Sequence, residues 1–177
     1  MIARRLSLEQ ILTQCAELGV RFVTDGSGIL FFTCELVFDI ETYMSDELLG
    51  GIIRSQAELL KSAQLFTAEQ LEQALAERFD PRQPAPPGQF KQEAWLRLNC
   101  GELRQHCADA GFYFAKDEAN TLLICSDYLS GQDIDAALSD RMFGAIVRNR
   151  AALLKVATPL RRQQHHFHHF QTEELTP

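Results

Sequence analysis

Two acidic pairs have the spacing that carboxylate chemistry needs. Residues 39–41 read Asp-Ile-Glu and residues 133–135 read Asp-Ile-Asp, so each pair could share a metal ion or a proton on one side of an extended segment. The alternative is a solvated loop whose acids favour the start of a following helix, at Ser45 and at Ser139. Neither pair has a histidine or a Gly-rich phosphate loop beside it. We therefore predict that the protein is not an enzyme.

Histidines and cysteines are the other candidates for chemistry. Four histidines lie close together near the C-terminus and could converge on a transition metal: His165, His166, His168 and His169. We prefer incidental histidines in a surface tail and predict no metal and no cofactor. Cys107 follows His106, but neighbours on a helix point about 100° apart and do not face one another. The five cysteines form no CxxC pair, which favours buried thiols over a zinc site or a disulfide framework.

The elements that would carry these residues occur twice in the chain. SDELLGGIIRSQAELLKSA at 45–63 is answered by SDRMFGAIVRNRAALLKVA at 139–157, and 12 of 25 positions are identical from Asp39 onward at an offset of 94. Upstream, CAELGVRF at 15–22 matches CADAGFYF at 107–114, and FFTC ending at Cys34 matches LLIC ending at Cys125. Such self-similarity indicates a tandem duplication.

Each copy predicts helices around a hairpin. In the first, Ser7 and Gln10 form a capping box, Gly19 ends the helix, and a Gly-rich turn joins two apolar strands. A long helix starts at Ser45, and residues 36–44 before it read as a loop. Its apolar stripe has six positions that are filled in both copies: Leu48, Leu49, Ile52, Ile53, Leu59 and Leu60, then Met142, Phe143, Ile146, Val147, Leu153 and Leu154.

The fold class that follows is α+β, built from two tandem αββα(α) repeats. An isolated hairpin is marginal in water, so we expect the two hairpins to pack or pair about a pseudo-twofold axis, in a pseudo-dimeric monomer or a homodimer. We predict a first repeat at 1–80 with an extra helix at 67–79, and a Pro-rich linker at 81–90. A second repeat at 91–159 and a His-rich surface tail at 160–177 complete the chain.

Charge and hydropathy exclude some classes of function. The net charge is -7, with 6 Lys/Arg against 13 Asp/Glu in residues 1–80 and 11 of each in the rest, which argues against general nucleic-acid binding. The chain has no run of 18 apolar residues, and MIARRLSLEQ lacks the features of a secretory signal, so we expect no membrane contact and a cytoplasmic location. A local basic run at 139–162 keeps nucleic acid as an alternative partner.

One copy resembles the N-terminal docking domain of the TubC type. The resemblance rests on the helix ending near ELGVRF, the hairpin with the turn DGSG, the polar loop and the helix SDELLGGIIRSQAELLK, over residues 8–63 and more weakly 100–157. It implies an αββαα unit that dimerises and receives a short linear segment of a partner in modular nonribosomal peptide and polyketide synthases. This chain differs in carrying two copies and no synthase domain after them.

These inferences predict a non-enzymatic protein–protein interaction module, such as an adaptor, a docking protein or an inhibitor. The resemblance implies peptide binding at the hairpins, by strand addition at an open edge. The candidate contacts on the hairpins are Arg21, Phe22, Leu30, Phe32, Phe114 and Leu123. Charged contacts to an acidic partner would come from Arg54, Lys61, Arg148 and Lys155. The alternative is a nucleic-acid-associated regulator that uses the basic helix at 139–162.

Overall fold

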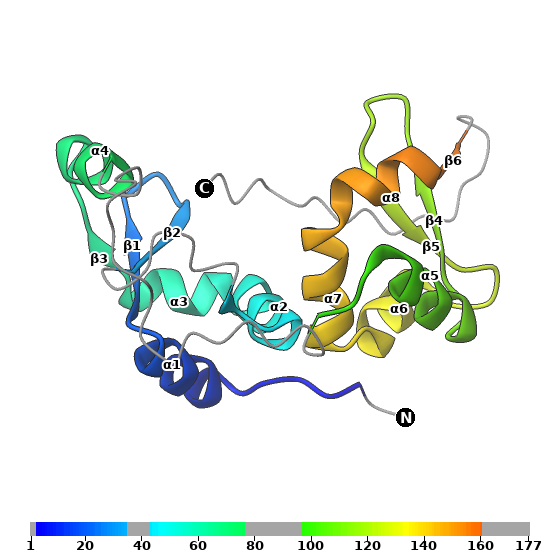
Figure 1. Cartoon of the computed structure of the whole chain (residues 1–177), viewed down its shortest axis with the longest axis horizontal. Coiled ribbons are helices and arrows are strands. Elements are labelled where there is room, and N and C mark those ends of the chain that lie inside the picture. Colours follow the sequence, from blue (N-terminus) through cyan, green and yellow to red (C-terminus); the bar gives the residue numbers. More distant parts are fainter. Residues whose placement is uncertain (1–2, 35–42, 77–96, 161–177) are drawn as a thin grey trace.

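The computed structural model describes residues 3–34, 43–76 and 97–160. It is an α+β protein, and the described residues form eight α-helices and two three-stranded sheets. Figure 1 shows two lobes, with one sheet in each and with helices between them. We call residues 3–76 the N-terminal unit and residues 97–160 the C-terminal unit. Among the described residues, no helix is long and apolar enough to cross a membrane.

Local signals set the bounds of the elements in the N-terminal unit. Ser7 and Gln10 form the predicted capping box of the first helix, and Gly19 follows its end with φ of 70°. Thr67 and Gln70 exchange the same kind of hydrogen bonds before α4. The elements are α1 (Leu8–Glu17), β1 (Val20–Thr24), β2 (Leu30–Cys34), α2 (Asp46–Arg54), α3 (Gln56–Ser62), β3 (Gln64–Leu65) and α4 (Ala68–Ala76).

The C-terminal unit has a closely related order. Asn99 and Glu102 form a capping box there, and Gly111 adopts φ of 81° after the helix. The elements are α5 (Cys100–Asp109), β4 (Tyr113–Lys116), β5 (Leu122–Cys125), α6 (Gly131–Ala137), α7 (Asp140–Arg148), α8 (Arg150–Val156) and β6 (Thr158–Pro159). The prediction of a loop across residues 133–135 is wrong, because these residues belong to α6, which Ser130 caps.

The two sheets have the same layout. Each contains the predicted antiparallel hairpin, β1 with β2 and β4 with β5, and a two-residue strand that pairs parallel to the first hairpin strand. The strand orders are β2-β1-β3 and β5-β4-β6. Sequence patterns did not predict β3 and β6, since two residues are too short for a period-2 pattern.

The long helix predicted from Ser45 is two helices, which is a correction. α2 ends at Arg54 and α3 begins at Gln56, with Ser55 at φ -91° and ψ 12°, and Asn149 separates α7 from α8 with nearly the same angles. The Asn149 side chain donates to the carbonyls of Leu98 and Ala145, at 3.1 and 2.8 Å, so it competes with the helical hydrogen bonds. The bend lets α2 and α7 face one another while α3 and α8 cover the sheets.

Each unit has its own hydrophobic core. Ile11, Leu30 and Leu59 are almost fully buried in the N-terminal unit, and Leu103, Ile124 and Leu153 are in the C-terminal unit. Burying one such side chain contributes roughly 1.5–3 kcal/mol. All twelve positions of the predicted apolar stripes are buried or half-buried, which confirms that their first role is packing.

The hairpins do not pack or pair with one another, contrary to our expectation. Each hairpin belongs to its own sheet, and Figure 1 places these sheets far apart, on the outer sides of the two lobes. The physical reason is that each hairpin obtains its cover within its own unit, from a third strand and from α3 or α8. The Pro-rich segment 81–90, the loop acids Asp39 and Glu41, and residues 161–177 lie outside the described residues.

Candidate functional site

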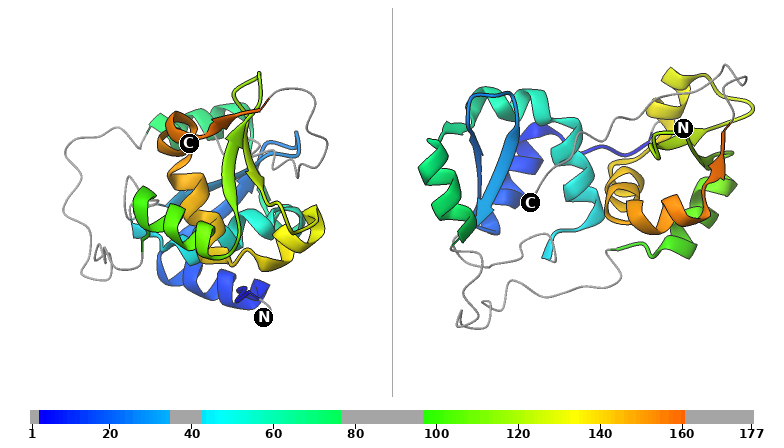
Figure 2. Two further views of the ribbon diagram at one scale, coloured as in Figure 1. Left: turned by 90° about the vertical axis from the view of Figure 1, so that its right-hand side faces the viewer. Right: turned by 90° about the horizontal axis from the view of Figure 1, so that it is seen from above.

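The two units meet where α2 and α7 approach through glycine. A Cβ atom on Gly50 would clash with the backbone carbonyl of Asp140, and one on Gly144 would clash with the backbone carbonyl of Asp46. Figure 2 shows the two helices side by side in the view from above. Glycine is required at both positions because only its missing side chain lets the two backbones come this close.

A carboxylate and a guanidinium join the helices on one side of this contact. Arg148 of α7 donates from Nε and Nη2 to Asp46 of α2, at 2.8 and 2.9 Å. Asp46 is 1% exposed and also accepts a 2.7 Å hydrogen bond from the backbone N–H of Leu98. Arg148 donates in addition to the Leu98 carbonyl at 2.9 Å. This is a bidentate, charge-assisted contact to a buried carboxylate.

The other side carries the corresponding residues in a looser arrangement. Arg54 Nε lies 2.9 Å from Asp140 Oδ1 but is not aligned for a hydrogen bond. Its other nitrogens donate to Asp135 at 3.2 Å and to the Leu138 carbonyl at 2.7 Å, and the guanidinium stacks 5.0 Å from the centre of the Phe143 ring. Burial, with Arg5 nearby, lowers the pKa of Arg54 from its ordinary value. The interface therefore has one bidentate ion pair, between Arg148 and Asp46, and a second arginine, Arg54, whose nitrogens are divided among several acceptors.

The segment before each unit's first helix reaches across to the other unit. The Leu6 N–H donates to Asp140 at 2.7 Å, as the Leu98 N–H does to Asp46. Arg5 donates to the Asp135 carbonyl at 2.6 Å, and Arg97 donates to the Met44 carbonyl at 3.2 Å. Asp46 is thus satisfied by an arginine of the opposite unit and by a backbone amide from that unit's leading segment. Asp140 has the equivalent amide on Oδ2, but its Oδ1 faces Arg54 Nε without a hydrogen bond.

This geometry corrects the expected role of Arg54 and Arg148. We expected both to face an acidic partner, but their side chains are 14% and 28% exposed and are ion-paired within the chain. Lys61 and Lys155 are exposed on α3 and α8. The basic run at 139–162 therefore offers fewer positive charges to a nucleic acid than we expected, because Arg148 is ion-paired with Asp46. Residues 161–162 of this run lie outside the described residues.

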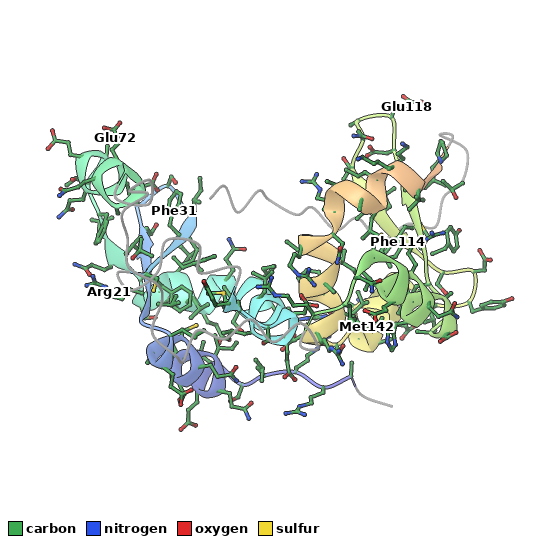
Figure 3. All side chains as sticks on the ribbon, in the orientation of Figure 1. Arg21, Phe31, Glu72, Phe114, Glu118 and Met142 are labelled. Carbon is green, nitrogen blue, oxygen red and sulfur yellow. The ribbon has the colours of Figure 1, made fainter. Side chains whose placement is uncertain are left out.

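The nominated hairpin residues fall into two groups. Four of them are at most 8% exposed and contribute to the cores: Leu30, Phe32, Phe114 and Leu123. They cannot meet a partner without unfolding, because continuous apolar strands need cover on both faces. Arg21 is exposed on the outer side of the first sheet and Phe22 is half-buried, as Figure 3 illustrates for Arg21 and for the buried Phe114.

The outer edges of the two sheets are the parts of the hairpins that could meet a partner. β2 and β5 each pair with one strand only among the described residues. Along β2, Phe31, Thr33 and Cys34 are half-buried, whereas all four residues of β5 are buried. The two edges therefore differ in how much side-chain surface they offer.

The residues considered for chemistry have structural roles in the described parts of the chain. Asp133 accepts from the Ser130 hydroxyl at the start of α6, and Asp135 pairs with Arg54. All five cysteines are free thiols, and burial raises the pKa of Cys15 and of Cys107 to about 12. No group of three or more His, Cys, Asp or Glu residues that could hold a metal occurs in the part that the structure describes.

Sequence reasoning overlooked the polar residues that join the units. Asp46, Gly50 and Arg54 are four residues apart, so they lie on one helix face, and all three recur unchanged at the offset of 94. That identity was a usable signal, because a solvated face has no reason to keep a glycine between an acid and a base. Compared with protein-family models, with curated proteins and with solved structures, the chain gives no match.

Proposed function

We propose that the protein is a non-enzymatic protein–protein interaction module that binds extended peptide segments at the outer edges of its two sheets. The observation that carries this proposal is the position of β2 and β5, each with one strand neighbour among the described residues. An edge strand presents a row of backbone N–H and C=O groups, and a peptide that adds as a further strand satisfies them.

The duplication supports this proposal. We infer that the two units are tandem repeats, because both have the strand order edge–centre–short strand and both supply an Asp, a Gly and an Arg to the contact between α2 and α7. On this view the contact replaces the subunit interface of a homodimer, and it leaves one sheet at each end. A protein with two separated edges suits the role of an adaptor that bridges two segments.

The TubC-type resemblance points the same way. Its αββαα unit corresponds to α1, β1, β2, α2 and α3, and such units dimerise and receive a linear segment. Arg54 and Arg148 are engaged within the chain, so an acidic partner has only Lys61 and Lys155 left of the four proposed cations. We therefore propose that the peptide binds through hydrogen bonds to the backbone of the edge strands. The half-buried Phe31 and Thr33 of β2 would select among peptide side chains.

Peptide selection followed by amide hydrogen exchange tests this function. Peptides would be selected from a random display library on the full chain, and exchange would be compared with and without the selected peptide. We expect new protection in residues 30–34 or 122–125, and little change in β1 and β4, which already have a strand on each side. Protection confined to other segments, or no peptide selected at micromolar affinity, would contradict the proposal.

A further inference from the structure

Tyr128 is the most exposed of the large apolar and aromatic side chains in the described residues, at 88%. It belongs to the segment between β5 and α6, which in Figure 1 lies on the outer side of the C-terminal unit, away from α2 and α7. An aromatic ring is a large amphipathic surface, and tyrosine is enriched where proteins bind one another. A ring this exposed is therefore available for contact with a partner.

Local hydrogen bonds fix the backbone that carries Tyr128. The Ser126 hydroxyl accepts the N–H groups of Tyr128 and Leu129, both at 3.3 Å. Leu129 packs against the core of the C-terminal unit, and Ser130 caps α6 immediately afterwards. A ring presented from a fixed backbone loses little conformational entropy on binding.

The residue before Tyr128 is an acid, Asp127, which is hydrogen-bonded to a second tyrosine. Tyr113 begins β4 opposite Cys125, is 39% exposed, and donates from its hydroxyl to Asp127 at 3.4 Å. The chain has no Lys or Arg from Asp117 to Asp140, but six acids. Of these, Asp127 and Asp133 are exposed and have no cationic partner among the described residues. The surface is aromatic and negative.

The structure assigns Tyr113, Asp127 and Tyr128 to a docking surface for a basic segment of a partner protein. A guanidinium or ammonium group would lie over the Tyr128 ring, and its charge would face Asp127. Arg21 occupies the position in CAELGVRF that Tyr113 occupies in CADAGFYF, so the N-terminal unit has a cation there instead. The surface goes beyond the proposed edge binding and belongs to one unit only.

Fluorescence anisotropy of the full chain with a labelled peptide of six arginines separated by glycines tests this inference. We expect saturable binding that Tyr128→Ala weakens about two- to fivefold, the size of an exposed cation–π contact. Tyr128→Phe keeps the ring and should bind like the unaltered protein. Because Tyr128 is so exposed, both variants should keep the melting temperature of the parent.

A charge-matched control separates this surface from general attraction to an acidic protein. Glu72 is exposed on α4, at the far end of the other unit, as Figure 3 shows. We expect Asp127→Asn to weaken binding and Glu72→Gln to leave it within about 1.5-fold, since charges beyond the screening length contribute little at 0.15 M salt. Equal weakening by both variants, or equal binding of a glutamate peptide of the same length, would overturn the inference. The proposed peptide binding at the sheet edges is measured by amide hydrogen exchange, so its failure is distinguishable from failure of this docking surface.

Discussion

Arg148 donates two hydrogen bonds to the carboxylate of Asp46, at 2.8 and 2.9 Å, across 102 residues of sequence. The contact joins the first helix of one α2–α3 pair to the corresponding helix of the other unit. Because Asp46 is 1% exposed, its carboxylate oxygens are hydrogen-bonded to this partner and to the Leu98 amide in place of water. The two units are therefore joined through α2 and α7 and not through their hairpins.

Removing Asp46 should therefore destabilise the whole protein. We expect Asp46→Ala to lower the free energy of unfolding by about 1–3 kcal/mol, because it removes the buried acceptor of the Arg148 and Leu98 donors. A double-mutant cycle with Arg148→Ala, measured by urea unfolding, should give a coupling energy of about 1–3 kcal/mol. Strictly additive losses would show that the pair contributes no specific interaction.

Gly50→Ala should separate the two helices. The added methyl group would meet the Asp140 backbone, which cannot move as a side chain can, so we expect a loss of about 1–3 kcal/mol or more. Gly51→Ala in the same helix is the matched control, because its methyl group would meet side-chain atoms only, at 3.2 Å from Cδ1 and Cγ1 of Ile11 and 3.4 Å from Asp140 Oδ2. Thermal melts of the two variants should differ clearly, and similar melts would contradict the close approach.

Cutting the chain between the units tests the strength of their contact. A protease site would be introduced within residues 81–90, and the products of cleavage would be analysed by gel filtration under native conditions. We expect the fragments to elute together, because the ion pairs and the crossing segments before α1 and α5 join them. With Gly50→Ala they should separate at micromolar concentration. Immediate separation of the unaltered fragments would mean that the linker holds them together.

Buried thiols should make the stability fall at alkaline pH. Burial raises the pKa of Cys15 from 9.0 to about 12, so above pH 9 the unfolded chain loses a proton that the folded chain keeps. Stability is full below pH 9 and decreases as pH rises toward 12, by about 1.4 kcal/mol per pH unit for each such thiol. Urea unfolding of Cys15→Ala between pH 9 and 11 should show a shallower decrease than the parent. An unchanged slope would contradict a protonated buried thiol.

Much of the local structure could be predicted from patterns of a few residues. The capping boxes at Ser7 and Thr67 and the hairpin turn at Gly26 and Gly28 depend on neighbours in sequence, so their signals are local. The sequence pattern did not predict the helix breaks at Ser55 and Asn149, because the apolar stripe continues through both positions. The reason for each bend is tertiary, since it lets α2 and α7 contact one another.

What the sequence determined by itself is therefore the two hairpins, the helical character of the segments beside them other than α6, and the apolar face that those segments bury. Periodicity, capping and turn residues act within one element, and they are the same wherever that element is placed. Only the tertiary structure decided that Arg54 and Arg148 turn inward and that the hairpins lie apart. An arginine on a helix face can meet solvent, a partner or a distant aspartate with equal local cost. The choice depends on whether two glycines let the helices approach closely enough to exclude water.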